Sequence, residues 1–317
     1  MSHEVESMFS VREKPWHYEM TKEVTKIIQE APNSFEALVA AGLDWTVEAR
    51  KISLLGENEA IPNAVANVRA SDNKVLGILT DRYKIVQNTD AFAFTDTLIG
   101  GDVRYETAGS LFGGRKIWLL AKLPTEKVLD DEVEPYLCFT NSHDGSGSVR
   151  AIMTPVRVVC NNTLNFALQD AKRAWSVRHT GNINAKIAEA REALELAKNY
   201  MSELDEYAER MVDAKVDEGM LRKMLGKCFK AKGEEASARE QANTDKLMNG
   251  FMTCYFAPDI AQYMGTAWGA LNAMADLVDH GEPNRASANY AENNWARIMG
   301  GHAMVDQFAG MLAGVGA

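Results

Sequence analysis

Short runs of alternating hydrophobic and polar residues, separated by polar turns, dominate the first half of the chain. A period of two is typical of β-strands that bury one face. Residues 45–47, 64–69 and 75–80 follow this pattern, and turn-forming residues at 56–58 and 71–73 separate them. The pattern therefore predicts three strands in this part of the chain.

Two longer hydrophobic stretches each predict a pair of strands. Residues 103–123 are broken by Gly113-Gly114, and glycine readily adopts the positive φ of a tight hairpin turn. Residues 136–160 are broken at 144–147, where the sequence Asp-Gly-Ser-Gly is a strong turn signal. We expect residues 1–182 to form an α+β domain around a curved, mostly antiparallel sheet.

Two helices are expected beside these strands. The first begins at Ser34, a residue type that caps helix N-termini, and ends at Gly42, because glycine is typical of a helix stop. The second covers residues 89–99, with Phe92 and Leu98 among the residues that face a core, and it ends before Gly100-Gly101.

From Ile183 the hydrophobic period lengthens to between three and four residues, which indicates a long amphipathic helix with coiled-coil character. A return arm is expected from about Val216, and further helices are expected within 243–281 and 296–312. We therefore expect residues 183–317 to form a mainly helical region. The stripe consists of Ile187, Ala190, Leu194, Ala197, Met201, Leu204, Ala208 and Met211.

The charge balance limits the partners of this chain. It has 317 residues, with 34 Lys and Arg against 44 Asp and Glu, for a formal net charge of -10. This acidity argues against coating nucleic acid or an anionic membrane by bulk charge, but it leaves room for a local basic groove. The four scattered cysteines, the absence of a long apolar run and the polar N-terminus predict a reduced, cytoplasmic protein without a membrane span.

Three enzymatic interpretations were weighed against simpler ones. Residues 108–116 have phosphate-loop glycine spacing, but Arg115 stands where Lys-Ser/Thr is required and a strand follows where a helix is required. Cys160 is a candidate nucleophile with His143 or His179 as its base, or else a small buried residue before capping residues Asn161-Asn162-Thr163. His143-Asp144 is a candidate for part of a metal site, but no second His/Asp pair stands at ligand spacing. The simpler interpretation is a turn that the Asp144 side chain stabilises.

The simpler interpretation is favoured in each case. We therefore expect no catalytic residue, no cofactor and no metal.

Positive charge is concentrated in one short segment. Between Arg150 and Arg178 the only nearby acid is Asp170. Tyr105, Trp118 and Trp175 are the candidate stacking faces. A cationic groove with aromatic platforms is the combination that binds single strands, because every nucleotide carries a phosphate and every base a π-face. The alternative is a set of solvated faces without convergence. The candidate nucleic-acid-binding residues are Arg115, Lys116, Trp118, Arg150, Arg157, Lys172, Arg173, Trp175 and Arg178.

Several long strings resemble the phage/plasmid-like proteins of the domain of unknown function 932 family. They are residues 15–17 (Pro-Trp-His), 40–48, 75–92, 106–124, 141–168 and 266–280. The resemblance implies a protein of phages, plasmids or integrated elements with a role in replication, recombination or conflict with the host. The hairpin at 144–154 followed by an expected helix at 162–174 also resembles, in topology, the core of phage single-strand annealing proteins.

Two functional hypotheses follow. The first is a DNA-metabolism accessory that binds single-stranded DNA and anneals it, with no cofactor. The second is a homo-oligomeric interaction protein that binds a host or phage protein, for example to counter a defence system. The acidic charge, the heptad stripe and the fifteen methionines, which suit adaptable surfaces, motivate the second.

Overall fold

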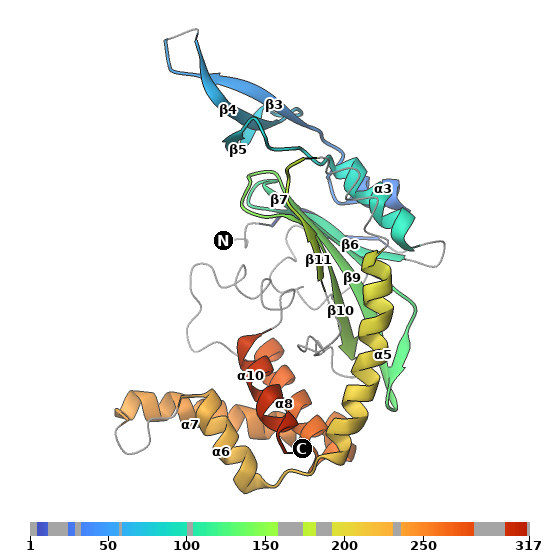
Figure 1. Ribbon diagram of the computed structural model, residues 1–317, viewed down its shortest axis with the longest axis vertical. Helices are drawn as coiled ribbons and strands as arrows, with labels where there is room; N and C mark the ends of the chain where they lie inside the picture. Colours follow the sequence, from blue (N-terminus) through green and yellow to red (C-terminus); the bar gives the residue numbers. More distant parts are fainter. Residues whose placement is uncertain are drawn as a thin grey trace. The chain divides into compact units, whose positions relative to one another are not determined.

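The computed structural model describes residues 5–11, 25–28, 33–56, 59–99, 104–157, 174–181, 192–230, 236–281 and 302–315. The fold is α+β, with a large and mostly antiparallel sheet (Figure 1). The chain packs as two compact units. The first takes its described residues from Met1–Pro124, Tyr136–Met153 and Lys172–Lys198, and the second from Thr125–Pro135, Thr154–Ala171 and Asn199–Ala317. The domain boundary at residue 182 stays a prediction.

The large sheet has the strand order β11-β10-β9-β7-β6-β1-β2, and the short β8 pairs with β9. Strands β1 and β2 are parallel, whereas β1 with β6, β6 with β7, β7 with β9 and β10 with β11 are antiparallel. The strands are β1 Val5–Ser10, β2 Thr25–Ile27, β6 Arg104–Leu111, β7 Lys116–Lys122, β8 Glu126–Val128, β9 Asp131–Ser142, β10 Val149–Arg157 and β11 Ala174–Val177.

Both predicted hairpin turns are confirmed. Gly113 and Gly114 have φ of 67° and 87° between β6 and β7, which glycine adopts without a steric penalty. Between β9 and β10, the Ser146 amide donates to Asp144 Oδ1 at 2.9 Å, and Gly145 has a φ of 75°. The Asp144 side chain therefore holds a turn, as the simpler interpretation expected.

A second, three-stranded sheet contains β3 Val47–Ser53, β4 Ala60–Arg69 and β5 Lys74–Thr80 in antiparallel order. The single curved sheet expected for residues 1–182 is therefore two sheets. Strand β3 begins at Val47, later than the predicted run at 45–47. The Asn88 side chain donates to Leu43 O at 2.9 Å and contacts Trp45 O at 3.4 Å, so a side chain bonds this backbone in place of a neighbouring strand.

Two helices cover one face of the large sheet. Helix α2, Ser34–Ala40, is capped by Asn33 rather than Ser34, because Asn33 Oδ1 accepts from the Glu36 amide at 2.9 Å. It ends as predicted at Gly42, whose φ is 66°. Helix α3 spans Asn88–Ile99 and contributes the buried Phe92. The core cluster between sheet and helices includes Phe9, Leu38, Phe92, Leu119 and Phe139.

The second unit contains most of the helical residues. They form α5 Glu192–Asp213, which begins in the first unit, α6 Glu218–Cys228, α7 Ala238–Tyr255, the 3₁₀ helix Pro258–Tyr263, α8 Ala267–His280 and α10 Ala303–Ala313. Helix α8 is buried along most of its length and packs against α7 and α10 (Figure 1). In α5 the predicted stripe is buried at Met201, Leu204, Ala208 and Met211. Coiled-coil pairing of α5 stays a prediction.

Two helix predictions differ from the structure where it can be compared. The helix expected at 162–174 lies outside the described residues up to 173, and Ala174 belongs to strand β11. The helix expected at 296–312 is described only from its cap, His302, and α10 starts at Ala303. Among the described residues, no helix combines the length and the hydropathy that crossing a bilayer requires.

The small sheet packs closely against the turn between β9 and β10. A Cβ atom added at Gly77 would lie 2.7 Å from Asp144 Cα, and one at Gly145 would lie 2.4 Å from Leu79 Cδ2. The Asn67 side chain donates to His143 O at 2.9 Å across the same contact. Glycine at 77 is therefore required by the close approach of the Asp144 backbone, whereas glycine at 145 is favoured by its φ of 75°.

Substituting Gly77→Ala is expected to lower the free energy of unfolding by about 2 kcal/mol, because the new methyl group overlaps backbone that cannot yield. Urea unfolding followed by circular dichroism measures this change. Gly226→Ala in α6 is the control, since no atom lies within 4 Å of its added Cβ. It should be neutral or mildly stabilising. Equal unfolding midpoints for the two variants would contradict the steric argument.

Candidate nucleic-acid interface

The alternation of side chains along β7, β10 and β11 shows on which face of the large sheet the predicted cations lie. Ile117 and Leu119 belong to the core cluster, so Lys116 and Trp118 lie on the opposite face, here called the Trp118 face. In β10, Val149 and Ala151 belong to the core cluster. Arg150 therefore lies on the Trp118 face as well.

The same alternation continues in β11. Val177 belongs to the core cluster, and Arg178 follows it directly, on the side of Ser176, which pairs with Arg150. The structure therefore brings Lys116, Arg150 and Arg178 to one face.

These cations also lie at one end of the large sheet. Lys116 is the first residue of β7 and pairs with Ser142, the last residue of β9. Arg150 is at the start of β10, and Arg178 follows the end of β11. Arg115 lies in the adjoining turn, where its carbonyl accepts from the His143 amide at 2.7 Å. We call this end, formed by residues 112–115 and 143–148, the turn end.

The two predicted tryptophans do not form a stacking platform. Trp118 is only 3% exposed, so its ring is not open to a base in this structure, and its role in binding stays a prediction. Trp175 lies on strand β11, not on a helix, and pairs with Ala151 on the core face. Period-two alternation therefore separates the two rings onto opposite faces. Tyr105 is also buried, with its hydroxyl 2.8 Å from Thr95 Oγ1.

Part of the predicted set cannot be placed. Arg157 is the last residue of β10, but its side chain lies outside the described residues. Lys172 and Arg173 lie outside them entirely, as do Cys160 and the Asn161-Asn162-Thr163 string. Arg115, Arg150 and Arg178 are exposed, Lys116 is half-buried, and none of the four forms a salt bridge within the part of the chain that is described.

Two cations, Lys122 and Arg104, and one aromatic residue, Phe112, were not among the predicted site residues. Lys122 lies on the Trp118 face at the far end of β7 and pairs with Arg104. The alternation along β7 would have found Lys122. At the turn end, Lys116 Nζ lies 5.2 Å from the centroid of the Phe112 ring, which is cation–π geometry. An aromatic residue directly before the Gly113-Gly114 turn was the available signal.

Two acids near the turn end, Glu6 and Asp72, are paired with the buried Arg69 and with Lys74, whereas Asp144 lies within the turn end and accepts from the Ser146 amide. Arg69 donates to Glu6 at 2.8 Å and to Asp72 at 2.7 Å, and Lys74 Nζ lies 3.6 Å from Glu6. Hydrogen bonds from Arg69 lower the pKa of Glu6 below its usual value and lower that of Asp72 to about 2. Both carboxylates therefore stay ionised and paired, which limits their repulsion of a phosphate at the turn end.

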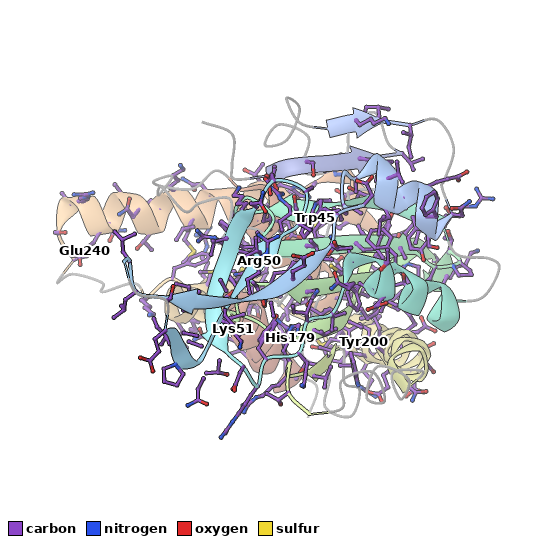
Figure 2. The ribbon with its side chains drawn as sticks, turned by 90° about the horizontal axis from the view of Figure 1, so that it is seen from above. Trp45, Arg50, Lys51, His179, Tyr200 and Glu240 are labelled. Atoms are coloured by element: carbon purple, nitrogen blue, oxygen red, sulfur yellow. The ribbon has the colours of Figure 1, made fainter. Side chains whose placement is uncertain are left out.

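Arg50 of the small sheet is engaged within that sheet. Figure 2 shows Arg50 and Lys51 on β3. Arg50 donates to Glu48 at 2.9 Å and to Asn73 at 2.8 Å. Arg50 is therefore paired within its own sheet and is not assigned to the interface.

Two histidines are buried behind the turn end. His143 Nε2 lies 3.0 Å from Asn88 Oδ1, an acceptor, so Nε2 carries the proton. His179 Nδ1 lies 2.9 Å from Lys84 O, and its ring stacks on Tyr83 with centroids 4.5 Å apart. Burial lowers the pKa of His143 to about 3 and also lowers that of His179. Both rings are neutral at pH 7 and add no phosphate-binding charge.

The described residues contain no group of three or more His, Cys, Asp or Glu side chains arranged to hold a metal. His143 is fully buried, and its carbonyl and ring bind Asn67 and Asn88. These contacts assign His143 to the interior of the fold.

The fold and this site define an α+β protein whose antiparallel sheet gathers cations at one end. Residues 75–298 match the family described as Domain of unknown function (DUF932). The match covers most of the chain, and the chain belongs to this family. No curated protein and no solved structure matches the chain.

The buried histidines predict a stability that depends on pH. Below pH 6.5 the unfolded chain binds protons that the folded chain excludes, since the pKa of folded His143 is about 3. The stability that neutral His143 contributes is fully present above pH 6.5, and it is lost as the pH falls toward the folded pKa of about 3. Between pH 7 and pH 5, His143 alone should lower the free energy of unfolding by about 2 kcal/mol.

Urea unfolding at pH 7 and pH 5 measures this difference. His143→Gln should reduce the difference between the two pH values, even if it lowers stability at both. His280→Gln alters an exposed histidine and serves as the control. A His143→Gln variant that keeps the full wild-type difference would contradict the assignment.

Proposed function

We propose that this protein binds single-stranded DNA at the turn end of the large sheet. The observation that carries the proposal is the shared face and shared end of Lys116 on β7, Arg150 on β10 and Arg178 directly after β11. Cations that share a face and form no salt bridge among the described residues can neutralise successive phosphates and release counterions. The acidic remainder of the chain favours a confined site of this kind.

The strand order gives the expected path of the nucleic acid. β11 and β10 are neighbours, and β9 lies between β10 and β7. Adjacent strands are about 4.8 Å apart, so the cations step across the sheet at intervals of roughly 5–10 Å. The phosphate backbone would therefore cross the strands rather than follow one of them.

A single strand fits this site better than a duplex. Duplex DNA is stiff over about 150 base pairs, so it would bring further phosphates against the acidic surface. A flexible strand can follow a small cationic patch and turn away from repelling charge. The resemblance of the sequence to phage proteins extends this proposal to strand annealing, to recombination and to an origin in phages or plasmids.

Arg150→Ala and Arg178→Ala are each expected to weaken binding of a labelled single strand about threefold to tenfold at low salt. Each should also reduce the slope of log affinity against log salt by about 0.7, because one phosphate contact is lost. Fluorescence anisotropy at several salt concentrations measures both quantities. Arg239→Ala, at an exposed position in α7, removes the same charge and is the control.

Two outcomes would reject the proposal. One is wild-type protein that does not bind single strands at low salt. The other is binding whose affinity is independent of salt, since phosphate neutralisation requires salt dependence.

A second candidate function is an oligomeric interaction protein, with α5 pairing as a coiled coil. The supporting observation is a set of exposed apolar side chains on and beside the small sheet, which is unusual for surface without a partner. Retention of a host protein after nuclease treatment would favour this candidate over DNA binding. The set comprises Leu54, Leu55, Ile61, Val75 and Ile78.

A further inference from the structure

Phe112 has a backbone conformation that bulky residues rarely adopt. Its φ is 55°, in the left-handed region, and Gly113 and Gly114 continue the turn with positive φ. In the first unit, the other described non-glycine residues with positive φ are Asn63 and Asn73, a residue type that tolerates this region. A side chain such as that of Phe112 costs about 1 kcal/mol there.

Core packing does not account for this strain. The Phe112 ring is half-buried and does not belong to the core cluster. Its defined contact is with the Lys116 ammonium group, 5.2 Å from the ring centroid. The strained conformation therefore holds an aromatic ring at the surface of the turn, beside a cation.

The surroundings of the ring are cationic. Arg115 is exposed three residues along the same turn, and Lys116 begins β7. The Lys74 side chain lies beside Gly113, where an added Cβ would be 2.2 Å from its Nζ. Glu6, whose carboxylate lies 3.3 Å from a Cβ added at Gly114, is already bound to Arg69. The turn thus combines an aromatic ring with phosphate-binding side chains within a few residues.

We infer that Phe112 stacks on a base of the bound single strand. The inference rests on the proposed function and names the aromatic platform that Trp118 and Trp175 do not supply. A base that covers the ring displaces the Lys116 ammonium group, which is then released to bind the adjacent phosphate. Stacking accepts every base, because each base has a π-face, so the site should be tolerant of sequence.

Two variants of Phe112 separate the ring from the backbone. Phe112→Asn removes the ring and suits the left-handed conformation, so it should fold at least as stably as wild type. Phe112→Trp keeps an aromatic face at the same position. Each variant is titrated by anisotropy against a labelled single strand and against an abasic strand of the same length.

The Phe112→Asn variant is expected to bind the base-containing strand about tenfold more weakly than wild type and to bind the abasic strand equally well. Phe112→Trp should retain wild-type affinity for both strands. Thermal unfolding of the variants confirms that they are folded.

Three results would overturn the inference. Unchanged affinity of Phe112→Asn for the base-containing strand would show that the ring does not stack. Equal losses on both strands would show that Phe112 acts through Lys116 alone. Wild-type protein that binds neither strand would reject the proposed function itself, and so differs from the first two results, in which the wild-type protein binds.

Discussion

The hydrogen bonds of buried His143 are the constraint on which the candidate interface depends. Its carbonyl accepts from Asn67 of the small sheet, its amide donates to Arg115 O in the other turn, and its ring meets Asn88 at the start of α3. One residue thus ties two turns, a second sheet and a helix. Arg115 lies in the turn between β6 and β7, and Lys116 follows it directly. The positions of both residues therefore depend on the hydrogen bond between the His143 amide and Arg115 O.

The junction also explains why a polar sequence is buried at a turn. Asn141 donates to Val86 O, Tyr83 donates to Ser142 O, and the Ser142 hydroxyl donates to Gly147 O. These side chains bond backbone carbonyls at and beside the turn, which removes the main penalty of burying the polar groups. The histidines are compatible with this interior only when neutral, since an unpaired buried charge is far more costly than a buried polar group.

The sequence predicted the features that depend only on residues close together in the chain. Gly113-Gly114 and Asp144–Gly147 specify their turns, and Gly42 specifies a helix end, because each acts through its own backbone conformation. The separate small sheet was not predictable, since β-strand pairing joins residues that the pattern does not connect. The burial of Trp118 was not predictable, because every residue from Ile117 to Ala121 is apolar and the run does not show which positions are exposed.

The net charge of -10 and a DNA-binding site are compatible because charge acts locally at physiological salt. The Debye length is about 8 Å there, so acids elsewhere on the surface are screened from a phosphate at the turn end. Among the acids near the turn end, Glu6 and Asp72 are held by Arg69, and Asp144 accepts from the Ser146 amide. Arg69 is buried and carries one positive charge, and Lys74, 3.6 Å from Glu6, supplies the second that balances the two carboxylates. The exposed Arg115, Arg150 and Arg178 outnumber Asp144 at this end, so the local charge is positive although the sum over the whole chain is negative.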